Sequence, residues 1–319
     1  TPVPFHESFE PAPGASARFA RAGHIIGSAS VALAVGARTV TFSGDVGRLA
    51  DPIMKPPEPL GPTDFLVVES TYGDRDHQPD DSGAALAEVI KSTTARSGKL
   101  VIPAFAIGRV EELLYWVRRL EAEHRIPVLP VYVDSPMATE ALRYYSARVA
   151  ELDPELRPTS GQVFAFATTR FQTIASTQQS KELTASRRPG IVISSSGMAT
   201  GGRVLHHLAA ALPDQRNTVL FVGYQAAGTR GRQLVDGARE VRIHGRDVPV
   251  TASVAKIDSM SAHADRGEVL RWLGTLGSAP RRLCLVHGEP SPMDSLKALI
   301  QDRLSWTPYT PAHGETIDL

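Results

Sequence analysis

Short apolar runs alternate along the chain with stretches whose apolar residues recur every three or four positions. This pattern predicts strands and helices in alternation almost throughout, which is typical of βαβ units and of an α/β fold. The predicted strands are residues 30–35, 39–43, 65–68, 100–102, 128–133, 191–194, 218–222, 240–243, 248–254 and 282–286. The pair 240–243 and 248–254 is predicted to form a hairpin around residues 245–247.

The predicted helices follow from the same periodicity and from their end signals. One begins near Ser135, whose hydroxyl can accept a backbone N–H, and Pro136 suits the first turn of that helix. Other helices are predicted around Leu113, Leu114, Val117 and Leu120, around Val269, Leu270 and Leu273, and over residues 203–212 and 292–304.

Polar residues stand just past the C-terminal ends of several predicted strands. Asp45, Glu69, Asp134 and His287 all occupy such positions. In α/β sheets, ligands gather at that end of the strands, so these side chains are expected to share one site. The alternative for each residue alone is that Asp and His begin turns.

Composition limits the classes of protein that the chain can belong to. Its 319 residues suffice for two domains or for one large α/β domain with an insertion, and 42% hydrophobic with 21% charged residues is ordinary for a globular protein. No apolar run approaches the ~20 residues of a membrane span, so no membrane partner is expected. The net charge is zero, so binding of a nucleic acid would need a local basic cleft. The single cysteine, Cys284, excludes a disulfide scaffold and favours a cytoplasmic location.

Three histidines and two carboxylates are suited to zinc and phosphoryl chemistry when taken together. His24 lies between Gly23 and Gly27, Asp45 follows Gly44, Glu69 ends a strand, His263 precedes a helix and His287 ends the last long strand. Alone, each is ordinary: a core histidine or a turn aspartate explains it equally well.

These segments resemble the β-CASP branch of the metallo-β-lactamase superfamily, which includes bacterial and archaeal ribonucleases and the endonuclease of mRNA 3′-end cleavage. The resemblance runs from about Phe5 to the C-terminus. It also rests on the segments PAFAIGR (103–109), DSPMA (134–138), SGMATGGR (196–203), GYQ (223–225) and GTRGR (228–232). It implies a metallo-β-lactamase αββα sandwich, N-terminally incomplete, formed by residues 1–73 and 261–319. An α/β β-CASP domain at 74–260 would be inserted in it, with the active site in the groove between the two domains.

The resemblance also implies roles for these three histidines and two carboxylates. His24 and His287 would each ligate one of two zinc ions in an intact site, and Asp45 would bridge both. Glu69 would pair with His263, which would act near the scissile phosphate as general acid, so His263, Glu69 and Asp45 are the expected catalytic residues. Two cations can activate water and neutralise charge on a phosphate, and a histidine held by a glutamate can donate a proton to the leaving oxygen.

One family motif is missing. No H-x-H-x-D-H string exists in the chain, and three ligands are too few for two zinc ions, since a catalytic zinc takes about three protein ligands. We therefore expect weak or partial zinc binding and poor cleavage. Because the chain starts at Thr1, we expect truncation rather than true loss of the motif, and an exposed sheet edge with poor solubility. His206 and His207 fall in a helical pattern outside the site, and the remaining histidines are expected at the surface or in turns: His6, His77, His124, His244 and His313.

The expected substrate is single-stranded RNA. Ser195, Ser196 and Gly197 lie in a strand-to-helix turn whose backbone N–H groups suit a phosphate. Arg203, Arg230 and Arg232 are candidates for contacts with the RNA backbone. Only 6% of the residues are aromatic, which favours backbone tracking over base stacking.

The leading hypothesis is thus a zinc-dependent ribonuclease that hydrolyses phosphodiester bonds as an endonuclease, with 5′→3′ exonuclease activity left open. One alternative is a catalytically inactive RNA-binding or scaffold subunit. Another is a DNA-processing β-CASP nuclease, which His287 disfavours because DNA-type members typically carry Val there. The sequence leaves open whether the protein forms a homodimer.

Overall fold

The chain divides into two compact units. The computed structural model describes residues 2–78, 83–156 and 166–318. Unit 1 comprises Thr1–His77 and Ala262–Leu319, and unit 2 comprises the segment between them, Gln78–Ser261. Unit 1 is therefore discontinuous in sequence, and unit 2 is inserted into it.

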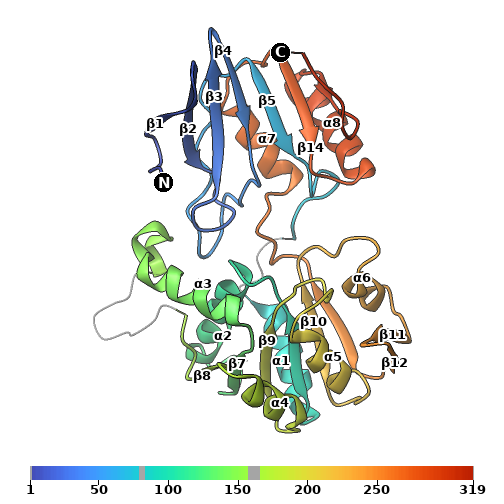
Figure 1. Cartoon of the computed structure of the whole chain (residues 1–319). Coiled ribbons are helices and arrows are strands. Elements are labelled where there is room, and N and C mark those ends of the chain that lie inside the picture. The colour runs from blue at the N-terminus through green and yellow to red at the C-terminus, as the bar shows by residue number, and fades with distance from the viewer. Residues whose placement is uncertain (1, 79–82, 157–165, 319) are drawn as a thin grey trace. The chain divides into compact units, whose positions relative to one another are not determined.

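The described part of unit 1 contains one mixed sheet (Figure 1). Its strands are β1 (Ser8–Ala12), β2 (Ala15–Arg21), β3 (Ala29–Val35), β4 (Arg38–Phe42), β5 (Phe65–Glu69), β14 (Arg282–Val286) and β15 (Pro308–Tyr309). They lie in the order β1-β2-β3-β4-β5-β14-β15. Pairing is antiparallel from β1 to β4 and parallel from β4 to β15. The sequence pattern missed β1 and β2, because Ala17 is the one fully buried residue in these two strands and no apolar run marks them.

Two helices cover one face of this sheet, α7 (Arg266–Gly274) and α8 (Pro290–Leu304). Asp265 starts α7 through a capping box with Glu268, which fixes the chain direction just after His263. The shared core consists of Val46, Leu66, Val68, Ala264, Val269, Trp272, Leu273, Leu283, Leu285, Leu296 and Ile300. Since side chains alternate along a strand, Phe65, Val67 and Cys284 face the other side, where they line a hollow of about 240 Å³.

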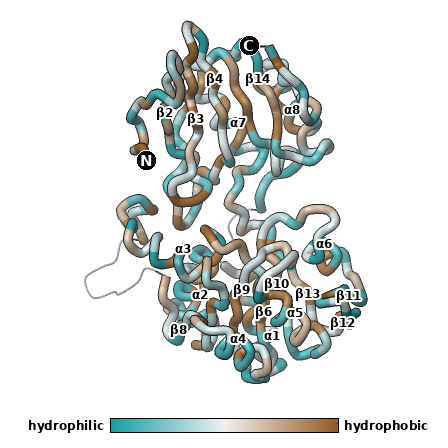
Figure 2. Tube along the Cα trace, viewed as in Figure 1, coloured by the Kyte–Doolittle hydropathy of each residue, from teal (hydrophilic) through white to brown (hydrophobic). Residues whose placement is uncertain are grey.

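Unit 2 is built on a sheet in which every described pairing is parallel. Its strands are β6 (Lys99–Pro103), β7 (Pro130–Val133), β8 (Arg170–Thr173), β9 (Gly190–Ser194), β10 (Thr218–Val222) and β13 (Ser253–Ile257). Their order is β13-β10-β6-β9-β7-β8. The central strands β6 and β9 are buried along their whole length and are mostly hydrophobic (Figure 2). This is the continuous apolar pattern of strands covered on both faces.

The helices of unit 2 connect these parallel strands (Figure 1). They are α1 (Ala84–Ala95), α2 (Arg109–Ala122), α3 (Pro136–Ala147), α4 (Thr177–Ala185), α5 (Val204–Ala211) and α6 (Arg230–Val235), with 3₁₀ turns at Val149–Glu151 and Pro154–Leu156. The predicted cap is confirmed, because the Ser135 hydroxyl accepts from the Ala138 N–H at 3.2 Å. α5 packs through Val204 and Leu208 against Val219 of β10.

The predicted hairpin is half right. Strand β11 (Glu240–Ile243) pairs antiparallel with β12 (Arg246–Pro249), around the turn His244–Gly245. The predicted second strand, 248–254, was too long. Pro249 has no N–H for the ladder, and the backbone amides of Thr251 and Ala252 bind the Leu212 carbonyl instead. The chain then starts β13, which pairs with β10. The apolar run continues across this break, so periodicity alone did not reveal it.

Among the helices of the described residues, none combines the length and the apolar composition that a membrane span needs.

Candidate active site

Histidine and carboxylate side chains at the ends of four strands of unit 1 lie at one edge of the sheet. β2 and β4 are both antiparallel to β3, and β4 is parallel to β5 and β5 to β14, so all four strands end at the same edge. His24 follows β2, Asp45 follows β4, Glu69 ends β5 and His287 follows β14 directly. His263 reaches the same place from the segment before α7.

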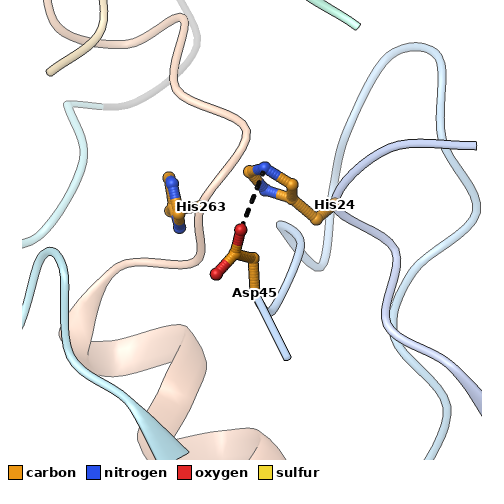
Figure 3. A group of neighbouring side chains, drawn as sticks. All are labelled: His24, Asp45 and His263. Atoms are coloured by element: carbon orange, nitrogen blue, oxygen red, sulfur yellow. Dashed lines mark ion pairs between the residues drawn. The ribbon is translucent and has the colours of Figure 1, made fainter. Parts of the chain in front are cut away.

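Asp45 lies at the centre of this group. Its Oδ2 is 3.8 Å from His24 Nε2 and its Oδ1 is 3.5 Å from His287 Nδ1. Figure 3 shows the imidazoles of His24 and His263 on either side of this carboxylate. Their ring centroids are 4.4 Å apart, and His24, Asp45 and His263 can each offer one ligand atom within 4.8 Å of the other two.

Backbone contacts hold the three segments together. Gly23 forms an isolated antiparallel β-bridge with Val46, and Gly47 forms another with His263. The Gly47 N–H also donates to the Ala22 carbonyl at 2.7 Å. The approach is so close that a Cβ on Gly47 would lie 2.0 Å from the carbonyl carbon of Gly23. The glycines that flank the chemical residues therefore permit main-chain contact between segments that are distant in sequence.

Glu69 is buried and fully engaged. Its Oε1 accepts from His263 Nδ1 at 2.9 Å and from the Val46 N–H at 2.8 Å, while its Oε2 accepts from the Thr71 N–H at 3.2 Å. Burial raises the pKa of Glu69, but hydrogen bonds from His263, Thr71 and Val46 and the charge of His263 outweigh it, so the pKa is lowered. An ionised carboxylate only accepts, so His263 donates through Nδ1 and keeps Nε2 for the site.

His24 is kept neutral. Burial and then the charge of His263 lower the pKa of His24 to about 4, against the opposing carboxylates of Asp45 and Glu69. Its buried Nδ1 has no hydrogen-bond partner among the described residues. A neutral imidazole with an unpartnered nitrogen, next to a carboxylate and two further imidazoles, is the donor set that zinc prefers. The residues present therefore fit a metal ion.

His77 was expected at the surface or in a turn, but it supports the site. Its ring Nε2 lies 2.9 Å from the His263 carbonyl oxygen, and its ring packs edge-on to the buried Tyr72 with centroids 4.9 Å apart. Burial lowers the pKa of His77. This contact joins residues 186 positions apart, so local sequence patterns carry no signal for it.

Asp134, the fourth predicted strand-end residue, is occupied by internal hydrogen bonds. It belongs to unit 2, where its fully buried carboxylate accepts from His207 Nε2 at 2.6 Å, Ser180 Oγ at 2.6 Å and Arg203 Nη1 at 2.8 Å. Burial raises the pKa of Asp134, but these three bonds more than offset that effect and the pKa is lowered. His207 is thus a buried partner of Asp134.

The residues predicted to contact RNA all belong to unit 2, where the serines and Gly197 lie in a loop and Arg230 and Arg232 lie in α6. Ser195, Ser196 and Gly197 follow β9; Ser196 Oγ is 3.0 Å from Thr200 Oγ1, and the buried Ser195 Oγ has no partner among the described residues. Each predicted arginine already has an internal partner. Arg203 donates to Asp134 and the Ile174 carbonyl, Arg230 to the Ala199 and Arg242 carbonyls, and the exposed Arg232 to Asp236.

Comparison with known proteins identifies the family. A Beta-Casp domain model matches residues 110–234, and a model described as the Zn-dependent metallo-hydrolase RNA specificity domain matches residues 247–311. The chain is 30% identical over 311 residues to an RNase J-like protein of Methanocaldococcus jannaschii, covering 95% of this chain and 70% of that protein. The chain belongs to the β-CASP family of the metallo-β-lactamase superfamily. The expected fold, a metallo-β-lactamase domain with an inserted β-CASP domain, is thereby confirmed.

Two further relatives are similar to most of this chain. A ribonuclease of Thermus thermophilus is 36% identical over 287 residues, covering 89% of this chain and 65% of the ribonuclease. The transcription termination factor FttA of Pyrococcus abyssi is 34% identical over 316 residues, covering 93% of this chain and 48% of the factor. The chain thus spans between about half and two thirds of these two relatives. A crystal structure of an Enterococcus faecalis protein of unknown function shares the fold, with TM-score 0.50 and 11% identity over 99% of this chain and 67% of that one.

We predict that Gly47→Ala destabilises unit 1 by about 2–3 kcal/mol, because the added methyl group forces apart the backbones after β2 and β4. Gly61→Ala is the matched control, since a Cβ at that position meets nothing within 4 Å. Urea denaturation of both variants measures the difference. Equal stability of the two variants would show that the close contact is not rigid.

Asp134→Ala should lower the free energy of unfolding by about 3–5 kcal/mol, because it leaves His207 and Arg203 without their buried partner. The control Asp236→Ala removes an exposed ion pair with Arg232 and should change the free energy of unfolding by less than about 1 kcal/mol. Because the folded-state pKa of Asp134 is lowered, its contribution is full above the unfolded pKa of about 4 and declines below it. Urea denaturation at pH 7 and below pH 4 measures the free energy of unfolding of both variants. If Asp134→Ala is less stable than Asp236→Ala by the same amount at both pH values, the ionised carboxylate of Asp134 is not the source of the stabilisation.

Proposed function

We propose that the chain carries part of the active site of a zinc-dependent ribonuclease that hydrolyses phosphodiester bonds of single-stranded RNA. The observation that carries this proposal is the convergence of His24, Asp45, His263 and His287 on one sheet edge, with the buried Glu69 behind them. The β-CASP membership, the RNA specificity model and the names of the ribonuclease relatives support RNA as the substrate. In this proposal residues 74–260 are the β-CASP domain, and residues 1–73 and 261–319 are the metallo-β-lactamase part.

We assign His24, Asp45 and His287 as metal ligands. The lowered pKa of His24 leaves its imidazole neutral at physiological pH, and Asp45 lies within 3.8 Å of both histidines. Zinc, when bound, activates water at neutral pH and neutralises negative charge on the phosphate. Two zinc ions need about three protein ligands each, and these residues supply three in total. The chain alone is therefore expected to bind zinc weakly or partially.

We assign His263 as the general acid. Glu69 fixes its Nδ1, which aims Nε2 into the site and favours the protonated imidazole. His77 holds the backbone carbonyl of the same residue, so both ends of His263 are restrained. A proton on Nε2 can then pass to the departing ribose oxygen. The closeness of His263 to His24 and Asp45 also admits a ligand role, which the experiment below separates from an acid role.

RNA contacts are proposed for the loop after β9. Backbone N–H groups at Ser195, Ser196 and Gly197 precede α5, a position suited to phosphate oxygens. The Ser195 hydroxyl, which has no hydrogen-bond partner in the described part of the chain, supports this proposal. Arg203 would act from its anchored position on Asp134, and Arg230 and Arg232 would contact the backbone of the strand. We also propose a cytoplasmic location, which the single buried thiol of Cys284 supports.

Zinc content tests the ligands. We predict that His24→Ala and Asp45→Ala each lower bound zinc by at least about tenfold at limiting zinc, because each removes a donor from a sparse set. His313→Ala, an exposed histidine outside the cluster, is the control and should bind zinc like the parent chain. Elemental analysis after dialysis against micromolar zinc measures the effect. Unchanged zinc content in the first two variants would remove the metal proposal.

Substitution of the acid tests the mechanism. His263→Ala and Glu69→Gln should lower the rate of single-stranded RNA cleavage by about 10²–10⁴-fold and leave the zinc content nearly unchanged. Cleavage of a labelled oligonucleotide and elemental analysis are run on the same samples. Loss of zinc in His263→Ala would reassign this residue as a ligand. Full cleavage by both variants would favour chemistry elsewhere, and RNA binding by the parent chain with no cleavage even at saturating zinc would favour the inactive scaffold.

A further inference from the structure

A polar cavity lies wholly within unit 2. It has a volume of about 740 Å³ and opens at the N-terminal edge of the parallel sheet, where Lys99 starts β6 and Asn217 directly precedes β10. The loop proposed to contact RNA follows the C-terminal end of β9, so it lies at the opposite edge of the same sheet. The cavity therefore shares no lining residue with the loop proposed to contact RNA.

Lys99 supplies a buried charge in this cavity. The residue is 8% exposed, and its ammonium donates to the carbonyls of Leu183 and Ser186, each at 2.7 Å. Within the described residues no carboxylate forms an ion pair with it. Burial lowers the pKa of Lys99 to about 8, which reflects an ammonium that water and anions do not compensate. An ammonium has three N–H donors, so one remains after the two carbonyls.

Two arginines extend the positive lining. Arg216 contributes its guanidinium, which binds Asp214 through Nε and Nη2, and Asp214 also lines the cavity. Arg187 is exposed and takes part in no ion pair within the described part of the chain. The lining thus holds three cations, Lys99, Arg187 and Arg216, against one carboxylate, and it attracts anions.

Part of the wall is apolar, and polar side chains complete the lining. Ala210, Ala211 and Pro213 line it next to the cations, and the volume lies in the range of pockets that hold small organic ligands, about 300–1,000 Å³. A flat ring on the small apolar residues and a phosphate near Lys99 and Arg187 would use both parts. We propose that this cavity binds a small phosphorylated molecule the size of a mononucleotide.

A purely structural role for Lys99 makes a different prediction. The two carbonyls that it binds lie at the C-terminal end of α4, so Lys99 could serve only to cap that helix. In that case its replacement would lower stability without creating any ligand effect, and Arg187, which caps nothing, would be irrelevant. Arg187 is therefore the decisive residue.

Titration calorimetry of the full chain with adenosine monophosphate tests the proposal. The test variant is Arg187→Gln, and its matched control is Arg188→Gln, the adjacent exposed arginine that does not line the cavity. We expect the dissociation constant to rise about fivefold to tenfold in Arg187→Gln and to stay unchanged in Arg188→Gln. Lys99→Met, with its fold checked by circular dichroism, should bind adenosine monophosphate more weakly than Arg187→Gln does.

Three further probes define the ligand. Inorganic phosphate should compete with the nucleotide at higher concentration, and adenosine should bind at least tenfold more weakly than its monophosphate. Absence of nucleotide binding at millimolar concentration overturns the proposal, and so do equal effects of the two arginine variants. A single-stranded RNA oligonucleotide whose binding depends on Arg187 while the mononucleotide does not bind would assign the cavity to RNA and also overturn it.

Discussion

The candidate site depends on the buried carboxylate of Glu69. This one side chain accepts hydrogen bonds from the Val46 N–H after β4, from the Thr71 N–H after β5 and from His263 before α7. A buried charge is stable only when it is satisfied in this way. The requirement therefore ties three segments to one position, and in doing so it orients the imidazole of His263 beside His24 and Asp45.

Glycine makes the same arrangement sterically possible. The backbones at Gly23 and Gly47 approach too closely for any side chain, so the segments that carry His24 and Asp45 meet through their main chains. His24 and Asp45 therefore lie on loops whose backbones are restrained by these contacts. Such restraint is what a site needs when its side chains must keep fixed distances.

The two units use their parallel strands differently. In unit 1 the strand ends present side chains that remain available to a metal ion. In unit 2 the corresponding position, Asp134 after β7, is consumed by a closed network with His207, Ser180 and Arg203. The network holds α4 and α5 to the sheet and anchors Arg203, so the same sequence pattern serves structure in one unit and proposed chemistry in the other.

The sequence by itself determined the alternation of strands and helices and the family, and it predicted the five side chains that the structure brings to one sheet edge. Strongly apolar strands such as β5, β10 and β14 and the cap at Ser135 were predictable, because burial and capping leave local patterns. Periodicity missed β1 and β2 and the break after Pro249, where local pattern and pairing disagree. Only the tertiary structure decided that His77 supports His263, that Asp134 is buried against His207 and that Lys99 lines a cavity. Those facts depend on contacts between residues far apart in the chain, and no local pattern encodes such contacts.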